Sequence, residues 1–92
     1  MTNHLQEAVS DLVEKGLTVE EVDTLFAAMK NGVLMDPEAG PAVRKRVMSD
    51  GELRFRFVEQ SEVWLQTWEY SPELLAPVRH FAVQVANLFM EA

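Results

Sequence analysis

The chain has 92 residues, a formal net charge of -7 and no cysteine. This length predicts a single domain over residues 1–92, and 48% hydrophobic with 25% charged residues is typical of a folded globular protein. The lack of cysteine excludes disulfides, thiolate catalysis and zinc–thiolate sites. The N-terminus has no signal-peptide pattern, and polar residues interrupt the most apolar segment, 74–90. We therefore expect a cytoplasmic protein that does not enter a membrane.

The charge is unevenly distributed along the chain. Residues 1–42 carry a net charge of -6, residues 43–58 of +3 and residues 59–92 of -4. An acidic protein is repelled on average by nucleic acid and by anionic membranes, although a local basic patch can still bind them. Any contact with nucleic acid is therefore expected in residues 43–58.

The first third of the chain predicts two packed helices. Apolar residues recur at helical spacing over residues 3–15, where Asn3 is the expected N-cap and Gly16 the left-handed residue that ends the helix. A capping box, formed by Thr18 and Glu21, then begins a second helix. This second helix is expected over residues 19–30, with its end at Asn31-Gly32.

The basic segment 43–58 is interpreted as a β-hairpin. Its Ser49-Asp50-Gly51 fits a three-residue loop, in which a type I turn is followed by a left-handed glycine. This register sorts the side chains into an apolar face, broken by Lys45, and an arginine face. The apolar face consists of Val43, Val47, Leu53, Phe55 and Phe57, and the opposite face of Arg44, Arg46, Arg54 and Arg56.

A rival interpretation makes residues 41–49 a helix. Pro41 would occupy its first position, and Gly51 would follow its end. The basic cluster of Arg44, Lys45 and Arg46 would then lie on a helix just before a strand. The two interpretations predict different binding surfaces, so the choice between them decides much of the function.

The last third predicts a strand and a helix. After a turn at residues 59–62, the Trp, Val and Thr content favours a third strand over residues 63–70, although a helix over residues 59–69 is an alternative. Pro77 begins a helix over residues 77–90. The expected fold is therefore a two-layer α+β domain: a helix pair, a three-stranded antiparallel meander and a C-terminal helix, in the order α-α-β-β-β-α. In this fold the last helix covers the apolar face of the sheet.

No catalytic, cofactor or metal motif is recognisable. Each glycine is explained by a cap or a turn, so no phosphate-binding loop is expected. The two histidines, His4 and His80, lie far apart in the sequence and lack the spacing of metal ligands. The chain is therefore expected to bind neither a cofactor nor a metal and not to be an enzyme.

The remaining features favour a small acidic regulator that binds another protein, such as an inhibitor, an adaptor or a counter-defence protein of a phage or mobile element. One form of this hypothesis is nucleic-acid mimicry by a row of acids, namely Glu7, Asp11, Glu14, Glu20, Glu21 and Asp23. The expected binding residues of the basic segment are Arg44, Lys45, Arg46, Arg54 and Arg56. A homodimer would use Val63, Leu65, Phe81, Val85, Leu88 and Phe89.

The alternative function is a winged-helix-like transcriptional regulator that grips DNA through residues 43–58. The phrase Gly-Leu-Thr-x-Glu-Glu-Val, at residues 16–22, is similar to the first turn of many helix-turn-helix domains. That resemblance implies a recognition helix soon after residue 32, whereas residues 33–42 contain Asp-Pro and Gly-Pro pairs that are typical of a loop. A helix at residues 41–49 would favour this alternative, and a strand there would weaken it.

Overall fold

Within residues 4–68 and 71–91, which the computed structural model describes, every regular element is helical and no strand occurs. The predicted α+β class, with its β-hairpin and three-stranded meander, is therefore wrong. The elements are α1 (His4–Glu14), α2 (Val19–Leu34), α3 (Ala39–Arg44), α4 (Asp50–Gln66), the 3₁₀ turn η1 (Pro72–Leu74) and α5 (Leu75–Glu91).

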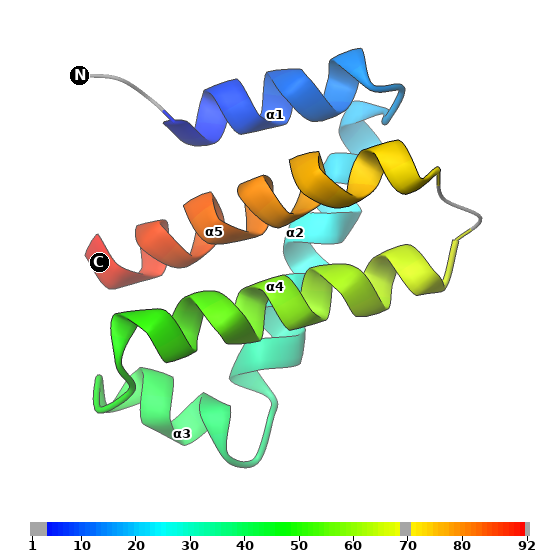
Figure 1. Cartoon of the computed structure of the whole chain (residues 1–92). Coiled ribbons are helices and arrows are strands. Elements are labelled where there is room, and N and C mark those ends of the chain that lie inside the picture. The colour runs from blue at the N-terminus through cyan, green and yellow to red at the C-terminus, as the bar shows by residue number, and fades with distance from the viewer. Residues whose placement is uncertain (1–3, 69–70, 92) are drawn as a thin grey trace.

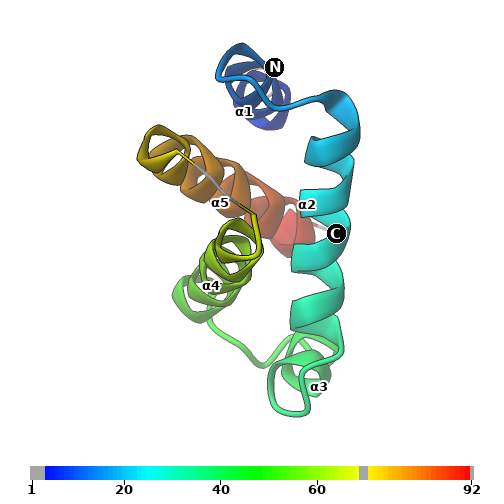
Figure 2. The same ribbon diagram turned by 90° about the vertical axis from the view of Figure 1, so that its right-hand side faces the viewer.

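The helices form two layers. Figure 1 shows α1, α5 and α4 side by side, with α5 in the middle, while α2 runs across behind them and α3 lies next to the far end of α2. The view in Figure 2 separates the three helices of the front layer from α2. The molecule measures 36 × 34 × 20 Å, and its shortest extent matches two layers of helices packed at about 8–10 Å.

The end of α1 is the predicted left-handed glycine. Gly16 has φ 107°, and the N–H groups of Gly16 and Leu17 donate to the carbonyls of Val13 and Leu12, each at 3.1 Å. This pair of bonds is a Schellman motif, which satisfies carbonyls that the helix leaves unpaired. The predicted N-cap, Asn3, lies outside the described residues.

The start of α2 is the predicted capping box. The Glu21 N–H donates to Thr18 Oγ1 at 3.1 Å, and the Thr18 N–H donates to Glu21 Oε1 at 3.0 Å. The predicted end at Asn31-Gly32 is wrong, because the helix continues to Leu34. A Cβ at Gly32 would overlap the side chain of Gln60, so this glycine lets α4 approach α2 closely.

A short helix, α3, follows a tight turn at Asp36. The Asp36 Oδ1 accepts the N–H groups of Glu38 and Ala39, each at 2.8 Å, and these two bonds hold the pKa of Asp36 below its ordinary value of 3.8. A Cβ at Gly40 would overlap the backbone carbonyl of Leu34, so only glycine fits where α3 folds back on α2. The rival interpretation of residues 41–49 was therefore partly right, since a helix is present but ends at Arg44.

The predicted hairpin and third strand are replaced by α4. Ser49 is its N-cap, with φ -68° and ψ 156°, and its Oγ accepts the N–H of Glu52 at 3.3 Å. Gly51 therefore lies in the first helical turn instead of a left-handed loop position. Buried residues then recur at helical spacing: Leu53, Phe57, Ser61, Trp64 and Leu65. The predicted strand over residues 63–70 is wrong where it is described, and its last two residues lie outside the described part.

The last helix, α5, begins two residues before its predicted start and includes Pro77 in its first turn. Proline is tolerated there because a first-turn N–H has no intrahelical acceptor. Polar bonds tie α5 to α4 along their length: Arg54 Nε donates to Asn87 Oδ1 at 3.1 Å, and Arg79 Nε donates to Glu62 Oε1 at 2.6 Å. Along each helix the two bonds lie eight residues apart, as expected for an antiparallel pair in constant register.

The core lies between the two layers. The Phe57 and Phe89 rings, whose centroids are 5.2 Å apart, join α4 to α5. Four helices contribute large, fully buried side chains, among them Leu12, Leu25, Met29, Phe57, Leu65, Phe81 and Val85. No helix in the described part of the chain combines the length and the apolar content needed to cross a membrane.

Candidate functional site

The basic segment does not form a common arginine face. Arg44 lies on α3 and donates to the Leu34 carbonyl at 2.9 Å, where a cation complements the C-terminal end of α2. Arg54, on α4, is bonded to Asn87 of α5. Arg56 forms a 3.0 Å ion pair with Glu52, and this hydrogen bond keeps the pKa of Arg56 above its ordinary value. Three of the five predicted binding residues therefore already stabilise the fold.

The other two basic residues lie at the end of α3. Lys45 is exposed, and Arg46 has φ 58°, which places a side chain in the left-handed region that glycine prefers. The N–H groups of Arg46 and Val47 donate to the carbonyls of Val43 and Ala42, at 3.1 and 3.0 Å. Arg46 thus occupies the position in a Schellman motif that Gly16 occupies at the end of α1, and it does so with backbone strain.

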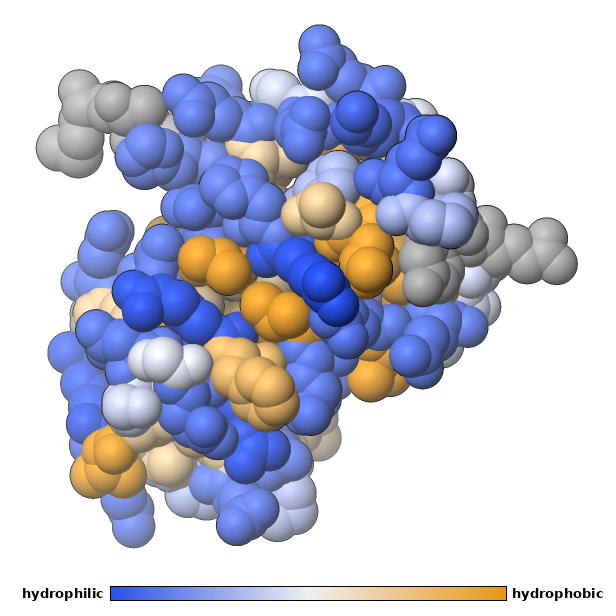
Figure 3. Space-filling view, viewed as in Figure 1, coloured by the Kyte–Doolittle hydropathy of each residue, from blue (hydrophilic) through white to orange (hydrophobic). Residues whose placement is uncertain are grey.

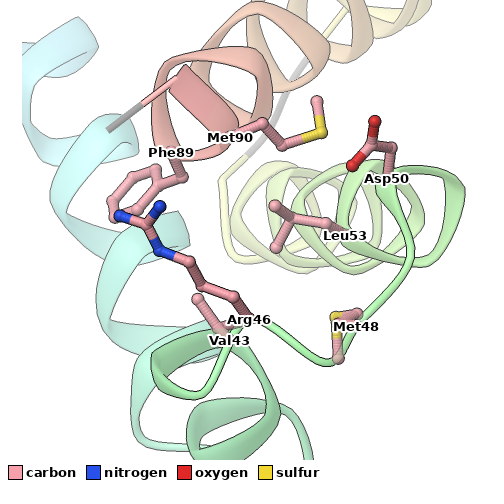
Figure 4. Close-up of a pocket in the computed structure, with 7 residues that line it drawn as sticks. All are labelled: Val43, Arg46, Met48, Asp50, Leu53, Phe89 and Met90. Atoms are coloured by element: carbon pink, nitrogen blue, oxygen red, sulfur yellow. The ribbon is translucent and has the colours of Figure 1, made fainter.

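The strained residue lines a pocket of about 130 Å³, which we call the methionine pocket. Its described lining consists of Val43, Arg46, Met48, Asp50, Leu53, Phe89 and Met90. Figure 4 shows the Arg46 guanidinium on the Phe89 side of the pocket and the Asp50 carboxylate on the Met90 side. The pocket thus has an apolar lining, with the cation of Arg46 on one side and the anion of Asp50 on the other.

The pocket exists because the chain folds back at the α3–α4 connection. The left-handed turn at Arg46 ends α3, and the N-cap at Ser49 begins α4 only three residues later. Between them Val47 is 73% exposed, next to Arg46 and Met48 in the lining. A large apolar side chain therefore stands in solvent between two residues of the lining.

The surface over α4 and α5 is apolar in places. Figure 3 shows hydrophobic residues in the middle of this face, separated by hydrophilic ones. The exposed apolar side chains of α4 include Phe55, at 58%, and Val63, at 49%. Such a mixed surface suits reversible contact better than a permanent interface.

The proposed mimic acids lie on two helices that run in different directions. Glu7, Asp11 and Glu14 share a face of α1, and Glu20, Glu21 and Asp23 belong to the first turns of α2. Figure 2 shows α2 running across the direction of α1. One of these acids, Glu21, already serves the capping box.

The predicted dimer residues divide into two groups. Leu65, Phe81 and Val85 are fully buried inside the chain, and Phe89 lines the methionine pocket. Val63 and Leu88 are exposed, so a dimer contact would have to rest on these two and their neighbours.

Sequence reasoning missed Met48, Asp50 and Met90 as site residues. A signal was present: Ser49 is followed three residues later by Glu52, the pattern of a helix N-terminus. That reading would have made Asp50 the first residue of a helix and brought Met48 next to its start. Among the described residues no cluster of three or more His, Asp or Glu side chains could hold a metal ion.

Comparisons with protein-family models, curated proteins and solved structures found no match to this chain.

Proposed function

We propose that this chain is a small acidic, non-enzymatic regulator that binds another protein, as an inhibitor or adaptor, through the methionine pocket. The observation that carries the proposal is the construction of this pocket: apolar walls with two methionines, between Arg46 and Asp50 on opposite sides. Its volume of about 130 Å³ is well below the roughly 300–1,000 Å³ of small-molecule sites. One large apolar side chain of a partner suits it better than a substrate.

The energetics of such an anchor are favourable. Burying a leucine- or phenylalanine-sized side chain contributes about 1.5–3 kcal/mol. Met48 and Met90 can adjust to its shape because methionine is unbranched and flexible. Asp50 then favours a basic or hydrogen-bond-donating group beside the anchor, since a charge favours an opposite charge or a hydrogen-bond partner.

The charge of the chain adds a preference for a basic partner. With a net charge of -7, the protein attracts positively charged surfaces over distances comparable to the Debye length. Such attraction speeds association and weakens with salt. The partner is therefore a protein that offers a large apolar side chain among basic residues, and a cytoplasmic location is part of the proposal.

Site-specific photo-cross-linking in the source cells tests the proposal. A benzophenone amino acid replaces Val47, which is exposed beside the pocket, or Val19, which is 63% exposed at the start of α2. We expect a discrete cross-linked protein from position 47, none from position 19, and loss of the product in Met90→Asp. Equal products from both positions, or a product that survives Met90→Asp, would contradict the proposal.

One observation favours a second candidate, a DNA-binding regulator. Residues 39–44 are helical, as that interpretation of the basic segment required. The wing, however, has no counterpart among residues 4–68 and 71–91, where no strand occurs. Arg44, Arg54 and Arg56 also donate to groups within the chain, so fewer cations are available for phosphates. Protein binding therefore remains our first proposal.

A further inference from the structure

A second pocket, of about 410 Å³, lies where the end of α4 meets the start of α2 and η1. We call it the tryptophan pocket, because Trp64 and Trp68 line it together with Glu21 and Thr67. Its aliphatic residues are Leu17, Leu65 and Leu74. None of these residues belongs to the methionine pocket, so the two sites can be tested separately.

One residue that lines the tryptophan pocket, Trp64, has an unmatched hydrogen-bond donor. Trp64 is only 7% exposed, and its Nε1–H is buried without an acceptor among the described residues. A buried indole N–H normally finds a partner, because leaving a polar group unpaired away from water is unfavourable. This donor therefore marks a place where a bound acceptor would stabilise the protein.

The other polar groups of the pocket limit what it can accept. Thr67 already uses its hydroxyl proton, which it donates to the Trp64 carbonyl at 2.7 Å. Among the described lining residues Glu21 carries the only charge, and one of its oxygens accepts the Thr18 N–H. The side chains of the lining thus supply one unmatched donor and one carboxylate, but few other acceptors for the N–H groups of an ordinary peptide.

These properties match a proline-rich peptide with a basic residue. Proline has no backbone N–H, so a polyproline helix brings carbonyl acceptors without donors that need partners. Proline rings pack on aromatic side chains, and the Trp64 and Trp68 rings are 5.7 Å apart with a tilt of 37°. An arginine or lysine beside the prolines would pair with Glu21.

We propose that the tryptophan pocket is a binding site for a proline-rich segment that carries a basic residue, with a peptide carbonyl accepting the Trp64 Nε1–H and the basic side chain paired with Glu21. The indole N–H is covered in this structure, so binding includes a local rearrangement that uncovers it. Trp68 is 51% exposed, so a bound peptide can cover its ring. The site goes beyond the methionine pocket and does not depend on it.

The chain carries its own reporters, because its two tryptophans both line the pocket. The ¹H–¹⁵N spectrum of the full chain shows one signal for each indole N–H. We would titrate an arginine-flanked polyproline peptide and follow both signals together with the tryptophan emission. We expect a saturable downfield shift of the Trp64 indole proton, as a new acceptor produces, and a blue shift as Trp68 loses water.

Matched variants separate the two contacts. Glu21→Gln keeps the capping box, which accepts either Glu or Gln, but removes the charge; we expect affinity to fall about two- to fivefold with a smaller salt dependence. Trp64→Phe removes the donor, and the loss of one hydrogen bond should weaken binding about fivefold. Trp68 still reports binding in that variant.

Two control peptides define the outcomes that overturn the proposal. One replaces the prolines with alanine, and the other replaces the flanking arginines with glutamate. An absent shift of the Trp64 indole proton, or equal binding of either control peptide, would overturn the proposal. Cross-linking from Val47 tests the methionine pocket independently, so failure at one site leaves the other standing.

Discussion

The Glu52 N–H donates to the Oγ of Ser49 over 3.3 Å, and this bond begins a 17-residue helix in the middle of the chain. The same residues, read as a hairpin loop, would have separated two strands. The N-cap satisfies an N–H that the first helical turn leaves without a partner. It therefore decides the conformation of the basic segment and with it the geometry of the methionine pocket.

Glycine substitutions test this conformation. Gly51→Ala should raise the free energy of unfolding by a few tenths to about 1 kcal/mol, because alanine loses less conformational entropy in a helix and nothing lies within 4 Å of the added Cβ. In a left-handed hairpin position the same change would destabilise the protein by about 1–2 kcal/mol. Chemical denaturation followed by circular dichroism measures the difference.

Gly40→Ala is the matched control for steric fit. Its Cβ would overlap the Leu34 carbonyl, so we expect a loss of about 1–3 kcal/mol or more. A Gly40→Ala protein as stable as the wild type would contradict the packing of α3 on α2.

The parts of the fold that the sequence predicted correctly are those with local hydrogen-bond signals. Gly16 marks the end of α1, and the capping box at Thr18 marks the start of α2. Each motif pairs backbone groups that its helix end leaves without a partner. The end of α2 was predicted wrongly because Gly32 does not end the helix. It lies against the Gln60 side chain of α4, a contact that no local pattern reveals.

The central segment failed for a different reason. Its Ser-Asp-Gly is compatible with a turn and with a helix N-terminus, and the alternating arginines favoured a strand. In the structure Arg54 reaches Asn87 and Arg56 reaches Glu52, so their alternation reflects separate contacts and not one polar face. The methionine pocket could not be predicted, because Met48 and Met90 are distant in the sequence and only tertiary packing brings them into one lining.

Because Arg46 has a strained backbone and lines the methionine pocket, replacing it should change stability and binding in opposite directions. Arg46→Gly relieves a left-handed backbone and should raise the free energy of unfolding by about 1 kcal/mol, while it removes a charged wall of the methionine pocket. We therefore expect greater stability together with less cross-linking from Val47.

Lys45→Gly is the control for this substitution. Lys45 has φ -87° and ψ -5°, a right-handed conformation that glycine does not favour, so glycine there should lower stability by about 0.5–1 kcal/mol. If Arg46→Gly lowers the free energy of unfolding as Lys45→Gly does, the left-handed backbone at Arg46 does not destabilise the protein.

Asp36 predicts a pH dependence. Hydrogen bonds from the N–H groups of Ala39 and Glu38 lower its pKa below 3.8, so its contribution to stability is full above pH 3.8 and is lost as the pH falls through the folded-state pKa. Asp36→Asn keeps the acceptor oxygen but removes the charge. Urea unfolding at a series of pH values should show the wild type losing its advantage over Asp36→Asn below pH 3.8. A constant difference at every pH would refute this role.

Nucleic-acid binding is expected to be absent. In fluorescence-anisotropy titrations with duplex and single-stranded DNA we expect no binding, even at low salt. The net negative charge of the protein repels DNA, and three arginines already donate hydrogen bonds within the chain. A combined variant, Arg44/Arg46/Arg54/Arg56→Ala, should instead lose stability, because it removes the hydrogen bonds to Leu34, Asn87 and Glu52. Tight binding that the variant abolishes would favour the DNA-binding candidate.

The central claim, that the methionine pocket receives a side chain of a partner protein, is tested most directly by methyl NMR of ¹³C-labelled methionine. Met48 and Met90 line the pocket, Met35 is 79% exposed elsewhere, and Met29 is fully buried, so each spectrum contains its own controls. On addition of the partner captured from Val47, we predict that the methyl signals of Met48 and Met90 shift while those of Met35 and Met29 stay in place. Unchanged Met48 and Met90 signals in a complex that still forms would contradict the claim.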